Sequence, residues 1–303
     1  MALEADRYLD RRRLKRRLTL WRVIAVAALV AATTIAFSQF GDFKRGSSIA
    51  TLDVTNIIFD DLRRTEALRK LAKDERVKAL IVRINSPGGT VVGGESLYFG
   101  LRGVAKTKPV VAVMGEVATS AGYMAAIGAD YIIGRRSTIT GSIGVLMQTT
   151  EITGLLTKLG IKAETIKSSP LKAQPNPLEP MSPAARAAAQ NIISDIYAMF
   201  VDLVTVRRNM DRGTVLKIAD GRIYTGRQAL GNGLIDAIGD MDAARQWLAE
   251  RRDIDKNLPL RPLKIKRDRD SLLERFDDLF GITLFSERLR LDGVISLWHP
   301  DLR

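Results

Sequence analysis

The chain has 303 residues, 46% of them hydrophobic, which is enough to bury the core of one large domain or of two ordinary ones. It contains no cysteine, which excludes thiol catalysis, disulfides and thiolate metal sites. Its single histidine, His299, lies near the C-terminus. A zinc site built from several histidines is therefore excluded, and we expect neither a metal nor a cofactor.

The formal net charge of +13 is unevenly distributed. Residues 1–22 carry eight Arg or Lys side chains against three carboxylates, whereas the other positive charges are dispersed and lack interleaved aromatic residues. This distribution argues against nucleic-acid binding. The basic cluster directly precedes an apolar segment, which favours a membrane explanation instead.

The apolar segment spans residues 23–40 and is extended by Leu20 and Trp21. Its length is close to the roughly 20 residues that cross a bilayer, and cationic flanks stay in the cytoplasm. The sequence thus predicts a basic cytoplasmic leader at 1–22, a single transmembrane helix at 23–40 and a main domain outside the cytoplasm. A cleaved signal peptide is the alternative, because Ala36-Phe37-Ser38 resembles a small-x-small processing site.

After a polar linker at residues 41–48, strand and helix patterns alternate. We expect strands at 49–54, 77–84, 110–114, 131–133 and 162–167, and helices at 57–71, 94–104, 149–159, 183–208 and 240–251, with a further helix starting near Ser120. This alternation predicts an α/β layer fold with a mostly parallel sheet, in a domain that spans residues 49–256. Ligands of such folds bind where strands end and loops begin.

The remaining tail, residues 257–303, has a different character. Charged residues alternate with apolar ones, and between Leu272 and Phe280 the apolar residues recur at roughly helical spacing. An amphipathic helix here would pack on its own domain, on a partner protomer or on the membrane surface.

The stretch from Gly115 to Ala126 carries the first candidate site residue. It follows the buried strand at 110–114, and the residues from Ser120 onward are small and apolar, as in a buried helix. A hydroxyl at Ser120 would lie at the mouth of that helix, where unpaired N–H groups and the helix dipole suit a nucleophile. The alternative is that Thr119 or Ser120 only caps the helix.

A second strand end carries the turn Pro87-Gly88-Gly89. Glycine lets a backbone N–H approach a ligand closely, although such turns also serve structure alone. The turn lacks the Gly-Lys-Ser/Thr ending of a phosphate-binding loop. Acyl transfer requires one loop that supplies an N–H and another that supplies a hydroxyl.

A serine nucleophile in this chain needs a base other than histidine or cysteine, and lysine is the established alternative. Lys172 lies in a proline-rich loop, residues 168–180, with few charges beside it. A lysine with the unperturbed pKa of about 10.4 is protonated at neutral pH, so desolvation would have to lower that value. The alternative for any one lysine is a solvated surface charge.

Four motifs together resemble the signal peptide peptidase A family of membrane-anchored bacterial serine proteases. They are Asn85-Ser86-Pro87-Gly88-Gly89, Ala118-Thr119-Ser120-Ala121-Gly122-Tyr123, Thr140-Gly141-Ser142-Ile143-Gly144 and Tyr224-Thr225-Gly226, in family order. The resemblance covers roughly residues 49–251. It implies a fold similar to the crotonase and Clp protease superfamily, with repeated β-β-α layers.

The resemblance also implies residue roles. Ser120 matches the nucleophile, Lys172 the general base, Gly88 and Gly89 the oxyanion hole, and Ser142 a residue that orients the lysine. In the short form of the family, protomers form a dome-like ring in which serine and lysine come from neighbouring subunits.

The family implies a protease of the bacterial inner (plasma) membrane with its catalytic domain outside the cytoplasm. Its partners would be membrane lipid, copies of the same chain and apolar peptides such as signal-peptide remnants, but not nucleic acid. Two alternatives remain at this point: a crotonase-like enzyme acting on acyl thioesters, and a non-catalytic membrane scaffold.

Overall fold

The computed structural model describes residues 17–30, 33, 46–265 and 294–297, and it divides the chain into two units, Met1–Ser47 and Ser48–Arg303. In the first unit, residues 17–30 and 33 are helical and include the start of the apolar segment. The rest of that segment, residues 31–32 and 34–40, lies outside the described residues. No helix in the described part of the chain is both long enough and apolar enough to cross a membrane.

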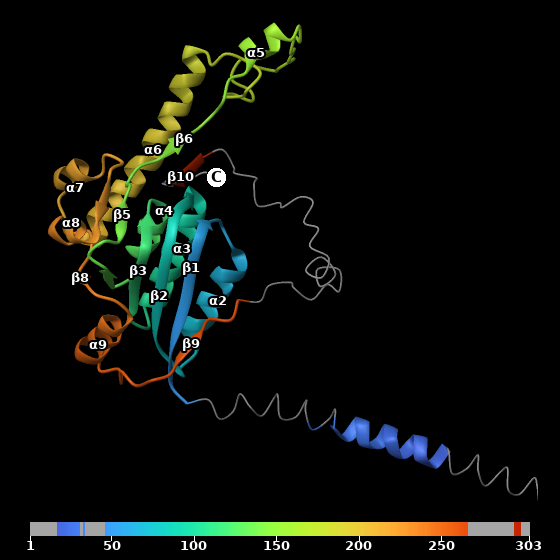
Figure 1. Ribbon diagram of the computed structural model, residues 1–303. Helices are drawn as coiled ribbons and strands as arrows, with labels where there is room; N and C mark the ends of the chain where they lie inside the picture. The colour runs from blue at the N-terminus through green and yellow to red at the C-terminus, as the bar shows by residue number, and fades with distance from the viewer. Residues whose placement is uncertain (1–16, 31–32, 34–45, 266–293, 298–303) are drawn as a thin grey trace, which may run out of the picture. The chain divides into compact units, whose positions relative to one another are not determined.

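The second unit alternates strands and helices (Figure 1). Its elements are β1 (Ser48–Ile58), α2 (Leu62–Lys73), β2 (Val77–Thr90), α3 (Val91–Ala105), β3 (Val110–Thr119), α4 (Ala121–Ala126), β4 (Tyr131–Gly134), β5 (Ile139–Gly141), β6 (Leu146–Met147), α5 (Thr153–Lys158), α6 (Pro183–Arg208), α7 (Arg212–Ile218), β7 (Ile223–Thr225), α8 (Gly226–Gly231), β8 (Ala237–Ile238), α9 (Met241–Arg252), β9 (Leu260–Pro262) and β10 (Val294–Leu297).

The strands form one mixed sheet whose main part is parallel. Strands β9, β1, β2, β3, β4 and β8 lie side by side in that order, all parallel to their neighbours. At the carboxyl end of β3 the sheet continues into β5 and then β7, and at the carboxyl end of β2 it continues into β10 and β6. The predicted α/β fold with a mostly parallel sheet is confirmed.

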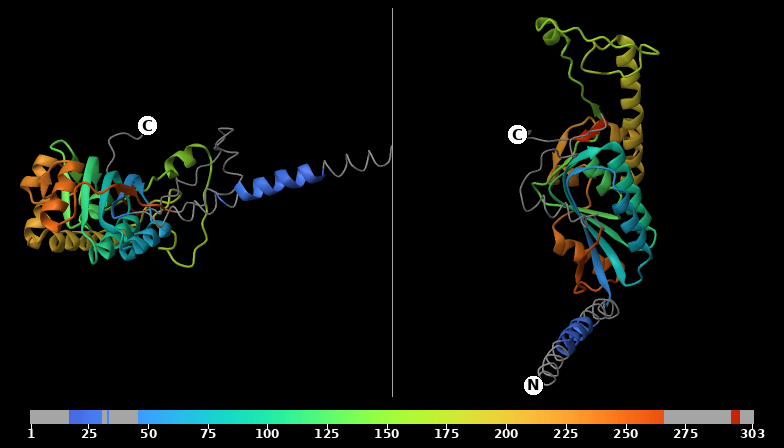
Figure 2. Two further views of the ribbon diagram at one scale, coloured as in Figure 1. Left: turned by 90° about the horizontal axis from the view of Figure 1, so that it is seen from below. Right: turned by 90° about the vertical axis from the view of Figure 1, so that its right-hand side faces the viewer.

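Alternating side chains of the central strands fill two cores. In β2, Leu80 and Val82 face the larger core, together with residues of α2, α3, α4 and α6, whereas Ala79 and Ile81 face a smaller core under α9. Figure 2 shows α2 and α3 on one side of the sheet and α9 on the other. The two-sided burial explains the near-continuous apolar runs of β2 and β3 in the sequence.

Local sequence fixes where the main helices begin. Asp61 accepts hydrogen bonds from Arg63 N and Arg64 N at the start of α2. Thr90 Oγ1 caps α3 through Gly93 N at 3.0 Å, and Ser182 caps α6 with proline in its first turn. Capping residues satisfy N–H groups that have no partner inside the helix.

Three sequence expectations need correction. Pro87-Gly88-Gly89 is not a turn after a strand end, because β2 runs through it to Thr90 and both glycines pair with β1. We keep the name glycine turn for these three residues. Residues 162–167 are not a strand, because this segment has no neighbouring strand with which to pair. The helix expected at 57–71 begins only at Leu62, because Ile57 and Ile58 extend β1 by pairing with Gly88 and Gly89. The helical spacing expected between Leu272 and Phe280 lies outside the described residues.

The close packing of α8 against the backbone of Arg135 can be tested at Gly226. A Cβ at Gly226 would lie 1.9 Å from the carbonyl oxygen of Arg135, whereas a Cβ at Gly231, at the other end of α8, would meet nothing within 4 Å. We expect Gly226→Ala to lower the free energy of unfolding by about 1–3 kcal/mol, as overpacking does. Gly231→Ala is the matched control and should leave stability unchanged or raise it by about 0.5–1 kcal/mol. Urea unfolding of both variants measures the difference, and equal midpoints would contradict the backbone contact.

Candidate active site

Ser120 occupies the tight turn between β3 and α4. Its backbone has φ 55° and ψ −120°, a conformation that a residue with a side chain adopts only when its surroundings enforce it. Ser120 N donates to Gly141 O at 2.9 Å, and Ser120 O accepts from Met124 N at 2.9 Å. The Ser120 side chain makes no capping hydrogen bond to α4, so capping does not explain this residue.

The glycine turn of β2 lies directly against this corner. Thr119 Oγ1 donates to Pro87 O at 2.9 Å, and a Cβ at Gly122 would lie only 3.0 Å from Ser86 O. Ser86 is paired with Ala118 after a register shift between β2 and β3. The glycine turn and the candidate nucleophile are therefore held together by the Thr119 hydroxyl before Ser120 and by close backbone packing at Gly122 after it.

Asn85 explains the register shift. Its side-chain oxygen accepts from Glu116 N at 3.0 Å and from Val117 N at 3.1 Å. These two bonds satisfy N–H groups of β3 where its pairing with β2 is interrupted. Asn85 thus sets the path of the strand that leads to Ser120.

The two glycines of the turn have different environments. Gly88 has φ 124°, a region that favours glycine, and its N–H donates to Ser86 Oγ at 3.1 Å. Gly89 packs so closely on β1 that a Cβ would lie 2.0 Å from Ile58 O. The N–H of Gly88 is thus already engaged within the turn.

Ser142 lies beside Ser120 through the pairing of β5 with β3. Thr119 is paired with Gly141, and Ser142 follows Gly141 directly. Ser142 also has a positive φ, 49°, and its N–H donates to Arg222 O at 2.8 Å. Both serines are buried, with 1% of Ser120 and 9% of Ser142 exposed.

Lys172 is not part of this cluster within one chain. It lies between α5 and α6, in a segment that we call the arm, residues 148–181, which extends beyond the N-terminal end of α6 (Figures 1 and 2). Lys172 is exposed, whereas α4 is buried in the body of the unit. The structure thus brings together the regions of Ser120, Ser142, Gly88 and Gly89, but places the predicted base elsewhere.

One further lysine of the arm, Lys167, is held by a carboxylate of the same segment. Lys167 forms an ion pair with Glu179, which also accepts from Gln174 Nε2 at 2.6 Å. The hydrogen bond from Lys167 lowers the pKa of Glu179 below its usual range. Because Lys167 is already engaged with Glu179 within the arm, Lys167 is a weaker candidate base than Lys172.

Strand β10 is the feature that sequence reasoning missed. It pairs antiparallel with β2, with Leu297 opposite Gly88 and Ser296 opposite Gly89, and it pairs with β6 on its other side. The run Val-Ile-Ser-Leu after Gly293 was the available sequence signal. The edge of β2 beside the glycine turn therefore accepts an extended segment in antiparallel register.

A family model and three relatives agree on the family. Residues 102–255 match Peptidase family S49. The chain is 38% identical over 209 residues to a Synechocystis protein named as a protease, covering 68% of this chain and 75% of that one. It is 33% identical over 250 residues to a protein of Methanocaldococcus jannaschii named as a protease, covering 77% of this chain and 80% of that one. It is 35% identical over 188 residues to a protein of Enterococcus faecium named as a signal peptide peptidase, covering 62% of this chain and 55% of that one.

The protein is therefore a serine peptidase with a mixed α/β fold. The chain belongs to peptidase family S49, and the resemblance to signal peptide peptidase A is confirmed. This assignment favours peptide hydrolysis over the acyl-thioester enzyme and the non-catalytic scaffold.

The contact between Thr119 and Pro87 generates a prediction. Thr119→Val removes the hydroxyl that donates to Pro87 O but keeps the shape of the side chain, so the glycine turn loses its tie to the strand before Ser120. We expect a loss of about 1 kcal/mol in the free energy of unfolding. Peptidase activity should fall about tenfold, because small displacements of catalytic groups are costly. Thr107→Val, which removes a hydroxyl bonded to Ala72 O on the surface, is the control. Equal activity of the two variants would contradict a role for the Thr119 contact.

Proposed function

We propose that the protein is a membrane-anchored endopeptidase in which Ser120 of one chain and Lys172 of a second copy form the catalytic dyad. The observation that carries this proposal is the geometry of Ser120, a buried serine at positive φ beside a glycine turn and beside a strand edge that accepts an extended segment. Peptides bind such edges through main-chain hydrogen bonds.

The exposed arm supports the participation of a second copy. Lys172 is exposed within a single chain, and a lysine serves as a base only where desolvation or a neighbouring charge lowers its pKa. Apolar residues of the arm are exposed as well, including Leu159 at 63% and Ile166 at 96%. Contact with another protomer would cover these side chains and Lys172 together.

The reaction that we propose is acyl transfer. Neutral Lys172 takes the proton of Ser120, whose oxygen attacks the peptide carbonyl, and then protonates the leaving amine. Lys172 next activates water to hydrolyse the acyl enzyme. Gly88 and Gly89 are the proposed oxyanion residues. Ser142, beside Ser120, orients the incoming lysine.

We further propose a homo-oligomeric ring of protomers with Clp-like β-β-α layers. A head-to-tail interface, in which the arm of each chain reaches the next, closes into such a ring. In this arrangement each active site is shared by two chains. The protease domain would be residues 49–256, and the tail at 257–303 would contact another protomer or the membrane.

The proposed location is the bacterial inner membrane. Residues 1–22 would remain in the cytoplasm, the apolar segment at 23–40 would anchor the chain, and the peptidase unit would face outward. A protease held at the membrane surface meets apolar peptides that remain there. We therefore propose signal-peptide remnants as substrates, in line with the name of the Enterococcus relative.

A mixing experiment tests the shared dyad. We expect Ser120→Ala and Lys172→Ala each to abolish cleavage of an apolar fluorogenic peptide, because each removes one half of the dyad. When the two inactive proteins are dissociated, mixed in equal amounts and reassembled, about a quarter of the sites combine an intact serine with an intact lysine, so activity should return.

The control for this experiment is Lys167→Ala mixed with Ser120→Ala. If Lys167→Ala alone is inactive and Lys172→Ala is active, the base is wrongly assigned. If both single variants are dead but mixing restores nothing, the dyad does not form between chains.

The β10 pairing gives a separate prediction. A peptide that binds the β2 edge must displace β10, so a chain that ends at Asp292 should cleave the same peptide with a lower KM than the full chain. A chain that ends at Trp298 keeps β10 and is the matched control. Equal KM values for the two truncated chains would contradict peptide binding at this edge.

A further inference from the structure

The turn that follows α4 has an unusual pattern of hydrogen bonds. The N–H groups of Ile127, Gly128 and Ala129 donate back into α4, at 3.0, 2.9 and 3.0 Å. Only 1% of Ile127 and 3% of Ala129 is exposed, so water does not satisfy the carbonyl groups of this turn. Buried carbonyl groups need donors from elsewhere in the protein.

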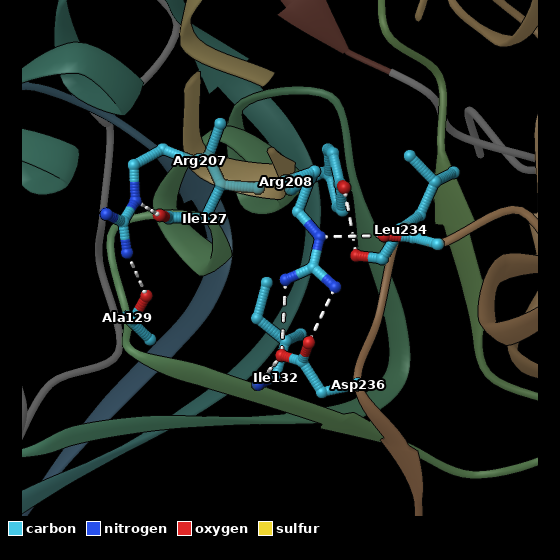
Figure 3. Close-up of polar contacts among 9 residues, drawn as sticks. Ile127, Ala129, Ile132, Arg207, Arg208, Leu234 and Asp236 are labelled. Carbon is cyan, nitrogen blue, oxygen red and sulfur yellow. Dashed lines mark hydrogen bonds and ion pairs between the residues drawn. The ribbon is translucent and has the colours of Figure 1, made fainter. Parts of the chain in front are cut away.

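Two arginines supply these donors. Arg207, in the last turn of α6, donates from Nε to Ile127 O at 2.8 Å and from Nη2 to Ala129 O at 2.8 Å (Figure 3). Arg102 donates from Nη1 to Gly128 O at 3.3 Å and pairs with Asp130. The rigid fork of a guanidinium allows one side chain to hold two carbonyl groups at once.

This arrangement places like charges close together. Burial lowers the pKa of Arg207, and the nearby charge of Arg102 lowers it further. The next residue, Arg208, is used differently: it donates to Gly233 O at 2.8 Å and pairs with Asp236 near β8 (Figure 3). Of the two adjacent residues, Arg207 bonds to the turn after α4 and Arg208 bonds near β8.

Helix α4 connects this turn to the candidate nucleophile. It has only 6 residues, all buried, and Ser120 directly precedes it. Ser120 O accepts from Met124 N, and Tyr123 O accepts from Ile127 N, so the hydrogen-bond ladder is continuous from Ser120 to the turn. The positive φ of Ser120 persists only if both ends of α4 are held.

We propose that Arg207 is a positioning residue that keeps Ser120 in its reactive geometry by holding the far end of α4. The proposal rests on the proposed function, in which Ser120 is the nucleophile. Arg207 contacts neither substrate nor Ser120 and acts through the turn at 127–129. The arm joins the N-terminal end of α6 and Arg207 lies at its C-terminal end, so one helix connects the arm to the nucleophile of the same chain.

The test compares three variants of the full chain: Arg207→Met, Arg207→Lys and Arg212→Met. The measurements are the second-order rate of reaction with a serine-directed fluorophosphonate, kcat and KM for an apolar peptide, and the unfolding temperature. Arg212 pairs with Asp202 on the surface and serves as the matched control. All assays run well below the unfolding temperature of every variant, so that a purely structural role would leave the rates unchanged.

We expect the fluorophosphonate rate and kcat of Arg207→Met to fall about tenfold or more, because the nucleophile is displaced. KM should stay within about twofold, since peptide binding on β2 is not affected. Arg207→Lys should recover part of the rate, and Arg212→Met should match the wild type.

The proposal is overturned if folded Arg207→Met reacts with the fluorophosphonate at the wild-type rate. If Arg207→Met does not fold, the Lys variant decides, because a wild-type rate there shows that the two-pronged contact is not needed. Ser120→Ala separates the two hypotheses: if it still hydrolyses peptides, the proposed function fails, whereas loss of activity in Ser120→Ala with normal rates in folded Arg207→Met overturns only the role of Arg207.

Discussion

The candidate active site depends on one backbone constraint, the positive φ of Ser120. The chain must leave the buried end of β3 and enter α4 within a single residue, and the sheet fixes the direction of entry through the bond from Ser120 N to Gly141 O. A conformation of this kind costs about 1–3 kcal/mol and must be offset by its surroundings. The contacts around Ser120 come from Thr119, Asn85 and the glycine turn. At the far end of α4, Arg207 bonds to the turn that follows the helix.

The candidate site and the exposed arm are separate parts of the second unit. The sheet brings Ser120, the glycine turn and Ser142 together, because they lie on adjoining strand ends. The exposed arm carries Lys172 and some exposed apolar side chains, among them Leu159 and Ile166. The candidate site and Lys172 thus lie in different parts of one protomer, and the proposed function brings them together between neighbouring copies.

The sequence predicted the features that depend on local pattern. The apolar runs of β2 and β3, the start of α6 after Ser182 and the turn before α4 all follow from periodicity, capping or small residues, and the structure contains them. The expectations that failed concern segments whose structure depends on pairing with another segment of the chain. Residues 162–167 have strand-like composition but no neighbour for pairing, and Ile57 joins β1 rather than a helix because Gly88 lies opposite.

The same distinction holds at the site. The sequence motifs identified Ser120, Ser142, Gly88 and Gly89. The fold brings these residues to adjoining strand ends. No local pattern indicates that Asn85 sets the register of β3, that Arg207 bonds to the turn after α4, or that β10 pairs with β2, because these contacts join residues far apart in the chain. Long-range contacts of single polar side chains leave no periodic signal in a sequence.

The most direct test of the central claim is to locate the reactive serine chemically. The full-length protein is treated with a fluorophosphonate, digested and mapped by mass spectrometry. We expect a single adduct on the peptide that contains Ser120, and we expect it to be absent in Ser120→Ala. An adduct on Ser142 or another serine, or no adduct on a protein that still hydrolyses peptides, would contradict the central claim.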